Sequence, residues 1–385
     1  MILVLNSGSS SLKFQLLNLE QNAVPFRGLI ERIGTKDAPL NFNGEHSQIR
    51  ALNHREAFEA IAQKLPLERI TAVGHRVVHG GEHFKNSVPI NPQLLETLET
   101  LSPLAPLHNP ANLEGIRAAL ELLPNLPMVA VFDTAFHATL PPKSYLYALP
   151  HALYTEHQIR RYGFHGTSHQ YVSKQAAKHL ERPIEQLKLI TLHLGNGASA
   201  CAVQNGASLD TSMGFTPLEG LVMGTRSGDL DPSVVLKLAQ LYGLEQTSEL
   251  LNKKSGLLGL SGVSNDLRDV HSSADAGVEW AERALEVMAY RITKQIGAYA
   301  AAMGGLDAII FTGGAGENDA DLRARALKNL EFLGLELDAE KNATRGMVEI
   351  SKIRSRAKIL VIPTDEERMI ALETVRVLGA RADNV

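Results

Sequence analysis

Cysteine is nearly absent from this sequence: Cys201 is the one cysteine among 385 residues. A single cysteine excludes an intramolecular disulfide and favours a protein of a reducing compartment. Cys201 lies in the small apolar stretch ASACAV. We therefore expect a buried structural residue there rather than a reactive thiol.

Long apolar runs and an excess of one charge are also missing. No stretch approaches the ~20 apolar residues that a membrane-spanning helix needs. No basic segment precedes the short apolar run at residues 2–5, as it would in a signal peptide. The 42 acidic residues nearly balance the 38 basic ones, so no basic surface for nucleic acid or an acidic membrane is expected. The composition predicts a cytoplasmic protein without nucleic acid or a membrane as a partner.

Two common nucleotide-binding motifs are absent, namely the P-loop and the dinucleotide fingerprint G-x-G-x-x-G. A different pattern occurs three times: ILVLNSGSSSLKF, LITLHLGNGASACAV and AIIFTGGAGEN. The first two predict β-hairpins with small polar tips, and the third predicts a strand followed by the helical stretch DADLRARALKNL. Backbone N–H groups of such tips can hold phosphate. Each tip taken alone is equally typical of a tight turn.

Helical patterns alternate with these strands, as in ANLEGIRAALELL and EWAERALEVMAYRITKQIGAYAAAM. Mixed elements of this kind predict α/β layers. The first two hairpins lie about 190 residues apart, which suggests that each opens one half of a duplicated architecture. The proline-rich stretch LPPKSYLYALP is a candidate boundary between the halves.

Several polar residues near strand ends are candidates for chemistry. VGHRVVH reads as a strand, on which Arg76 and Val78 face the same side. This pair offers a guanidinium and a methyl surface, or simply a surface ion pair and a core valine. A metal trio of His75, His79 and His83 is disfavoured, because strand residues four apart are separated by roughly 13 Å. Asp133 follows the strand MVAVF and is either catalytic or a helix cap.

Three further stretches place polar groups in loops. In RRYGFHGTSHQYV we expect Thr167 or Ser168 to cap a helix that begins at His169, which leaves His165 in a loop. Arg226 is central in GFTPLEGLVMGTRSGDLDP, where Asp229 and Asp231 either bind a metal or, as we rather expect, pair with arginine or cap the next helix. In IPTDEE, Thr364 and Glu367 fit a capping box, which leaves Glu366 free to approach a Mg²⁺ ion.

Taken together, these stretches closely resemble the acetate kinase family, and the match spans nearly the whole chain. The motifs occur in the family's order: VLNSGSSSLKF, GHRVVHGGE, PLHNP, FDTAFH, RYGFHGTSH, HLGNGAS, GFTPLEGLVMGTRSGDLDP, FTGGAGEN and IPTDEE. The resemblance implies an α/β, duplicated ribonuclease-H-like (actin-like ATPase) fold of two domains with the nucleotide in the cleft. We expect an N-terminal domain at 1–145, with a C-terminal helix at 368–385 packing back on it, and a C-terminal domain at 146–367.

The resemblance also implies roles for individual residues. Asp133, His165 and Arg226 match catalytic positions, and Asn6 and Glu366 match the metal positions. The residues that match the substrate site are Arg76, Val78, Leu107, Phe164 and Pro217. Those that match the nucleotide site are Lys13, His193, Leu194, Gly195, Asn196, Gly197, Asp266, Leu267, Arg268, Gly314, Ala315, Gly316, Glu317 and Asn318. The segment at 345–358 looks shortened, in a place that we expect to lie away from the site.

The implied reaction is reversible phosphoryl transfer from ATP to acetate, giving ADP and acetyl phosphate, with Mg²⁺, or alternatively Mn²⁺, as cofactor. A homodimer is implied as well. Two alternatives stay open at this point. A propionate kinase would share the mechanism, although Val78 favours acetate because a smaller residue would open the pocket. A chaperone-like ATPase of the same fold would hydrolyse ATP without a carboxylate.

Overall fold

The computed structural model describes residues 1–106 and 108–379. The chain divides into two compact units. The first unit comprises residues 1–138 together with the chain from 365 onward, and the second comprises residues 139–364. The C-terminal stretch of the chain thus completes the unit that the N-terminus begins. Within the described residues, no helix is both long enough and apolar enough to cross a membrane.

The first unit is built on a sheet in the order β5-β4-β3-β2-β1-β6-β8-β7. Its strands are β1 (Ile2–Gly8), β2 (Ser11–Asn18), β3 (Ala23–Ile30), β4 (Thr35–Phe42), β5 (Glu45–Ala51), β6 (Ala72–Val77), β7 (Val88–Pro89) and β8 (Met128–Phe132). Its helices are α1 (His54–Ala62), α2 (Pro92–Leu101), α3 (Asn109–Leu122) and α15 (Glu366–Val377). β1 and β2 form the first predicted hairpin, and β1, β6 and β8 run parallel.

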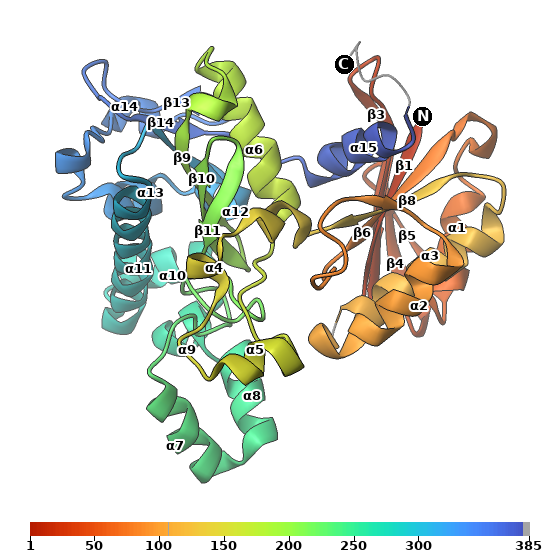
Figure 1. The fold of residues 1–385 in the computed structure, drawn as a ribbon, viewed down its shortest axis with the longest axis horizontal. Coiled ribbons are helices and arrows are strands. Elements are labelled where there is room, and N and C mark those ends of the chain that lie inside the picture. The colour runs from red at the N-terminus through yellow and green to blue at the C-terminus, as the bar shows by residue number, and fades with distance from the viewer. Residues whose placement is uncertain (107, 380–385) are drawn as a thin grey trace. The chain divides into compact units, whose positions relative to one another are not determined.

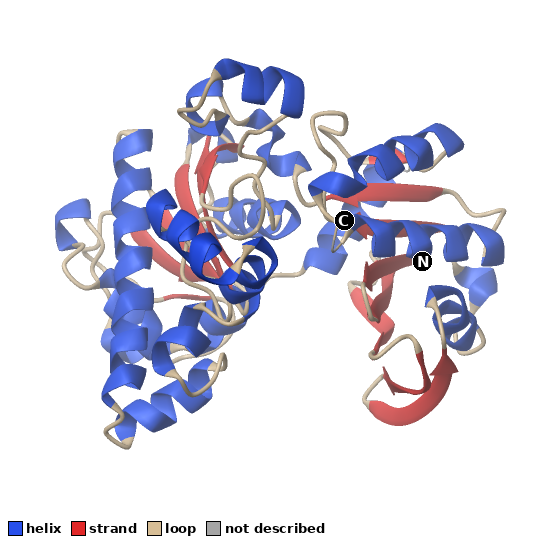
Figure 2. Cartoon of the chain, turned by 90° about the horizontal axis from the view of Figure 1, so that it is seen from below, coloured by secondary structure: helices blue, strands red, loops and turns tan. Residues whose placement is uncertain are grey.

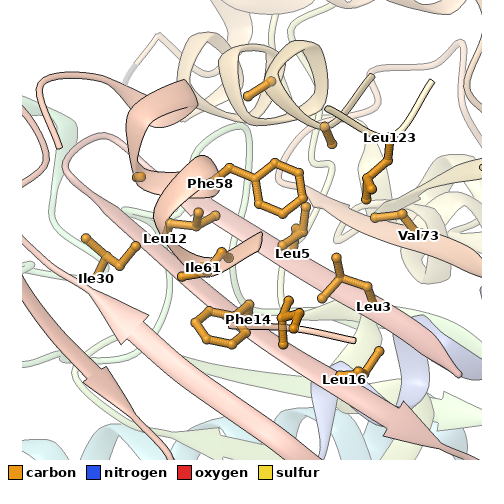
Figure 3. Close-up of a cluster of buried hydrophobic side chains, with 14 of the residues drawn as sticks. Leu3, Leu5, Leu12, Phe14, Leu16, Ile30, Phe58, Ile61, Val73 and Leu123 are labelled. Carbon is orange, nitrogen blue, oxygen red and sulfur yellow. The ribbon is translucent and has the colours of Figure 1, made fainter. Parts of the chain in front are cut away.

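Helices cover both faces of this sheet. On one face, α1 and α3 pack over β1 and β2, and the buried cluster between them includes Leu3, Leu5, Phe14, Phe58 and Ile61 (Figure 3). On the other face, α15 packs over β1, β6 and β8. Because successive strand residues point to opposite faces, Leu3 and Leu5 enter the first cluster while Ile2 and Val4 enter the α15 cluster.

The second unit repeats this plan with the sheet order β11-β10-β9-β12-β14-β13 (Figure 1). Its strands are β9 (Lys188–Leu194), β10 (Ala198–Gln204), β11 (Ala207–Thr211), β12 (Ala308–Thr312), β13 (Val348–Glu349) and β14 (Lys358–Val361). Its helices are α4 (Pro142–Tyr145), α5 (His151–His157), α6 (Gly166–His179), α7 (Pro232–Tyr242), α8 (Leu244–Lys253), α9 (Gly256–Ser261), α10 (Leu267–Asp275), α11 (Glu279–Met303), α12 (Gly313–Asn318), α13 (Ala320–Leu327) and α14 (Ala339–Asn342). Helices again flank the strands, as Figure 2 shows by colour.

The two sheets share one core topology. In each, an antiparallel hairpin (β1–β2 or β9–β10) continues into a further antiparallel strand, and two parallel strands follow on its other side. The order β3-β2-β1-β6-β8 therefore matches β11-β10-β9-β12-β14. The predicted α/β fold with a duplicated core is confirmed. The long helix α11 coincides with the predicted helical stretch, and Cys201 is buried in β10, as expected.

Candidate active site

In the first unit, a buried ion pair joins the ends of two parallel strands. Arg76 lies near the end of β6, and Asp133 directly follows β8. The Arg76 Nε lies 3.1 Å and 3.2 Å from the two Asp133 oxygens, and its Nη2 donates to Oδ2 at 2.6 Å. Burial alone would lower the pKa of Arg76, but the carboxylates of Asp133 and Glu366 raise it above its usual value. This two-pronged contact fixes the guanidinium plane.

Beside this pair, further acidic groups gather at the start of α15. The Glu367 carboxylate forms an ion pair with the Lys13 ammonium at 2.5 Å. Lys13 lies opposite Asn6 in the β1–β2 hairpin. The Asn6 side-chain oxygen lies 3.5 Å from Arg76 Nη1. Burial, with added repulsion from Asp133 and Glu367, raises the pKa of Glu366 to about 7, against the attraction of Arg76 and Lys13. Among the described residues, no group of three or more acidic, histidine or cysteine side chains is placed to hold a metal ion, so a divalent cation here would also need oxygens of other kinds.

In the second unit, His165 stands at the N-terminus of α6, and the predicted start of this helix is wrong. The helix begins at Gly166, and His165 is its N-cap with a left-handed backbone (φ 56°). Neither Thr167 nor Ser168 caps it, because Ser168 Oγ lies 2.8 Å from His193 Nδ1 and 2.7 Å from Thr364 Oγ1. The rings of His165 and His193 lie 4.3 Å apart between centroids.

Arg226 and His165 converge on the tip of the β9–β10 hairpin. A Cβ atom built on Gly197 would lie 2.9 Å from Arg226 Nη2 and 3.6 Å from His165 Nε2. The absence of a side chain at Gly197 lets both groups lie close to the backbone of the tip. Arg226 also donates from Nη1 to the Pro217 carbonyl at 2.7 Å, which ties it to a predicted substrate residue. Phe164, which precedes His165, is buried.

A cleft of about 720 Å³ lies wholly within the second unit and brings together three segments predicted to bind nucleotide. Its lining includes Gly195, Asn196, Asp266, Leu267, Arg268, Gly314, Ala315 and Asn318. This volume is typical of small-molecule sites. Other predicted residues lie behind the lining: Leu194 is buried in β9, and Glu317 Oε1 accepts from the Gly313 and Thr364 amides at 2.9 Å and 3.1 Å.

The cleft also contains residues that the sequence did not single out. Arg345 lines it, so the expectation that the shortened segment at 345–358 lies away from the site is wrong. Asn265 and His271 line it as well. Asn265 donates to the Asn196 side chain at 3.1 Å, and His271 Nε2 lies 2.8 Å from Asp319. Asn265 directly precedes Asp266, which is the one signal that could have marked it.

Comparisons with known proteins agree with this geometry. A profile of the Acetokinase family matches residues 1–372. The acetate kinase of Caldanaerobacter subterraneus subsp. tengcongensis is 54% identical over 98% of each chain. The chain belongs to the acetate kinase family. Among solved structures, Porphyromonas gingivalis acetate kinase has a TM-score of 0.94 at 47% identity, covering 98% of this chain and 99% of its own. A propionate kinase from Francisella tularensis has a TM-score of 0.93 at 45% identity, and the match covers 98% of this chain and 99% of that one.

Membership of the acetate kinase family makes the protein a phosphotransferase of duplicated α/β fold. One local prediction made from a motif of this family is wrong. Thr364 and Glu367 do not form a capping box, because Asp365 is the N-cap of α15 and accepts from the Arg368 amide at 2.9 Å. Thr364 contacts Ser168, and Glu367 pairs with Lys13. Glu366 is then the first residue of α15.

Two supporting contacts were not expected from the family resemblance. Asn112 of α3 donates to the Ser7 carbonyl at 2.7 Å and accepts from the Val78 amide at 3.0 Å, so it joins the first hairpin to the end of β6. Gly115, one turn later, allows close packing, because a Cβ there would lie 1.9 Å from Ser7 Oγ. Leu107, a predicted substrate residue, lies outside the described residues.

The loop that carries Pro217 and Arg226 is held by a half-buried polar network. Arg161 donates to Glu219 Oε1 at 2.5 Å and to the Thr211 carbonyl at 2.5 Å. Tyr147 donates to the same carboxylate and accepts from the Phe215 amide at 2.8 Å. Burial and the Glu219 carboxylate raise the pKa of Tyr147 above its ordinary value. At the end of this loop, Asp231 is the N-cap of α7, which confirms the prediction that an aspartate of this stretch caps the next helix.

Proposed function

We propose that the protein is an acetate kinase that transfers the γ-phosphoryl group of ATP to acetate, giving ADP and acetyl phosphate, and that also catalyses the reverse reaction. The observation that carries this proposal is the Arg76 guanidinium, which Asp133 holds in place at the end of β6, two residues before the small apolar side chain of Val78. A fixed guanidinium recognises a carboxylate, and a short methyl surface suits a two-carbon acid.

The geometry indicates which edge of Arg76 serves the substrate. Asp133 accepts hydrogen bonds from Nε and Nη2 of Arg76. The edge formed by Nη1 and Nη2 is left for a second carboxylate. We propose that the acetate carboxylate binds this edge and that its methyl group contacts Val78. Phe164 and Pro217 are proposed as further pocket residues, on the family resemblance.

The acidic cluster of the first unit fits a divalent cation. Glu366 supplies a carboxylate and Asn6 an amide oxygen, both ligand types that Mg²⁺ accepts. Burial and the carboxylates of Asp133 and Glu367 raise the pKa of Glu366 despite Arg76 and Lys13, and a bound cation would favour its charged form. We propose that these two residues hold Mg²⁺, with Mn²⁺ as an alternative. When bound with the nucleotide, the ion supplies charge neutralisation on the phosphate oxygens.

The cleft of the second unit is proposed to hold the nucleotide. Gly314 and Ala315 begin the short helix α12, and Asp266 caps α10 through the Arg268 amide at 2.9 Å. We propose that these segments contact the adenosine. The tip at 195–197 and the first hairpin with Lys13 are proposed to contact the phosphates through backbone N–H groups and a positive charge.

The chemistry requires charge stabilisation rather than a base. A simple carboxylic acid has a pKa of roughly 4 to 5 and is already ionised at pH 7. Asp133 therefore serves to orient Arg76. Arg226 and His165 both lie against Gly197 at the tip of the β9–β10 hairpin. We propose that they bind the oxygens of the phosphoryl group as it passes to the acetate oxygen.

A propionate kinase is the second candidate, because one solved relative carries that name at 45% identity. Val78 is 9% exposed, and we propose that it limits the acetate pocket on its side. One methylene changes discrimination by only about 1–3 kcal/mol. We therefore propose acetate as the better substrate and propionate as a poorer one.

We also propose that the protein forms a homodimer. Helix α7 has no buried residue, and its apolar side chains include Val234, Leu236 and Leu241, with exposures of 43%, 65% and 57%. Leu244 at the start of α8 is 82% exposed. Contiguous exposed apolar residues of this size are typical of a surface that pairs with another protein.

The function is tested by trapping the acyl phosphate with hydroxylamine. The purified protein receives Mg·ATP with acetate, propionate, butyrate or no carboxylate, and ADP is measured in parallel. We expect the highest kcat/KM with acetate. Equal ADP formation with and without carboxylate, and no trapped product, would refute the proposal and indicate an ATPase of the same fold.

A further inference from the structure

Behind His165, three buried polar side chains line up in a chain of hydrogen-bond contacts. His165 Nδ1 lies 2.9 Å from Ser199 Oγ, and the same oxygen lies 2.8 Å from His169 Nε2. His169 Nδ1 lies 2.7 Å from Thr191 Oγ1. Ser199, His169 and Thr191 are fully buried. The chain thus leads from the protein interior to a histidine proposed to contact the phosphoryl group.

The fold explains why these groups meet. In the β9–β10 hairpin Ser199 is directly opposite His193, so both side chains point to one face. Thr191 precedes His193 by two residues and shares that face. Helix α6 packs against β9 and begins beside His165, whose carbonyl accepts from the His169 amide at 3.0 Å. Residues four apart lie on one side of a helix. Both rings therefore reach the same serine.

The number of protons in this series of hydrogen bonds restricts the direction in which the bonds can be donated. Ser199 carries one hydroxyl proton and lies between two imidazole nitrogens. If the serine donates to His165 Nδ1, neutral His165 carries its proton on Nε2. His169 then donates from Nε2 to the serine, and its Nδ1 accepts from Thr191. If the chain runs the other way, neutral His165 presents a bare Nε2 nitrogen, which cannot donate to a phosphoryl oxygen.

The surroundings of His165 Nε2 favour a neutral ring, and the proposed contact with a phosphoryl oxygen requires the first direction. This nitrogen and Arg226 Nη2 face the same point above Gly197. A cationic imidazolium would place a second positive charge beside the guanidinium, and like charges this close repel each other. A neutral ring with its proton on Nε2 supplies a donor without that cost. Such a ring is what a negatively charged phosphoryl oxygen requires.

We infer that Thr191, His169 and Ser199 form a one-way hydrogen-bond chain that fixes neutral His165 in the tautomer protonated at Nε2, ready to donate to the phosphoryl group. This inference rests on the proposed function of the site. Ser199, His169 and Thr191 are positioning residues, because they act through His165 and do not touch the substrate. Nothing in the order of the sequence marks them, since 22 to 34 residues separate each contacting pair.

The direct test is the ¹⁵N spectrum of the whole protein labelled at histidine, with the His165 signals assigned by their loss in His165→Gln. We expect the shifts of a neutral ring protonated at Nε2 at pH 8. Signals of an imidazolium, or of the ring protonated at Nδ1, would overturn the inference. This readout does not depend on turnover.

The kinetic test uses Ser199→Ala and the isosteric Thr191→Val. Loss of one preorganised transition-state donor costs about 10²–10³ in kcat. We expect Ser199→Ala to lower kcat by at least about tenfold and at most about 10³-fold, because the tautomer protonated at Nδ1 becomes accessible. The KM values for acetate and ATP should stay nearly unchanged. Thr191→Val should shift the His165 signals in the same direction with a smaller loss of kcat. Its shape matches threonine, so it remains informative if Ser199→Ala fails to fold.

A matched control comes from the neighbouring strand β11. Ser208 is a buried hydroxyl residue that contacts Cys201 Sγ at 3.3 Å. Ser208→Ala should leave kcat and the His165 signals unchanged. Equal losses in this control and in the chain variants would overturn the inference. If the unmodified protein forms no acetyl phosphate but shows the Nε2 tautomer, the proposed function fails while the chain itself stands.

Discussion

Replacement of Asn112 by alanine is expected to remove the link between the β1–β2 hairpin and the end of β6 in the first unit. The change removes the side chain that donates to the Ser7 carbonyl and accepts from the Val78 amide. Both residues are buried, at 5% and 9% exposure. Each buried backbone group left without a partner costs about 1–3 kcal/mol, so we expect a loss of about 2–6 kcal/mol in the free energy of unfolding.

Asn109→Ala is the matched control. The Asn109 side chain also forms hydrogen bonds with two backbone groups, but both belong to His79 and neither lies in the first hairpin. Both variants should lower the urea midpoint similarly. Asn112→Ala should in addition raise KM for Mg·ATP and lower kcat, because the hairpin loses its link to β6. Asn109→Ala should change mainly the KM for acetate. If both variants change the same kinetic constant to the same extent, the proposed link has no functional role.

Four further outcomes are expected. Arg226→Lys keeps the charge but loses the planar fork, so kcat should fall by about 10³-fold, and a near-normal kcat would refute its role. Val78→Ala should shift kcat/KM toward propionate by about 1–3 kcal/mol, as measured by the hydroxylamine assay. Leu236→Glu places a charge on α7, so light scattering should show monomers, and an unchanged dimer would exclude this face. Burial raises the pKa of the Cys201 thiol to about 12, so thiol reagents at pH 8 should react only after unfolding, and fast reaction with the folded protein would contradict this.

The features that sequence reasoning found are those with a local signature. The two hairpins combine apolar strands with small polar tips, and the structure has them at 2–18 and 188–204. The segments proposed to bind nucleotide are rich in glycine, and several of them meet in one cleft. Such features are readable because their cause lies within a few residues.

The features that it missed depend on distant partners. A rule that favours serine or threonine as a cap placed the start of α6 too late, because His165 adopts a left-handed backbone. The capping box at 364–367 fits its motif, yet Lys13 engages Glu367 and Ser168 engages Thr364. Asn112 is separated from Ser7 by 105 residues, so no pattern along the chain could indicate their contact.

The helix α15 has a consequence for the order in which the protein can be made. It covers the face of the first sheet that Ile2, Val4 and Val129 form, and it is translated after the whole of the second unit. A ribosome releases the chain from its N-terminus onward. The first unit must therefore wait with that apolar face uncovered while residues 139–364 emerge and fold. Glu366 arrives on the same helix. The nascent protein thus gains its proposed metal ligand only after the second unit has emerged, together with the cover of its first core.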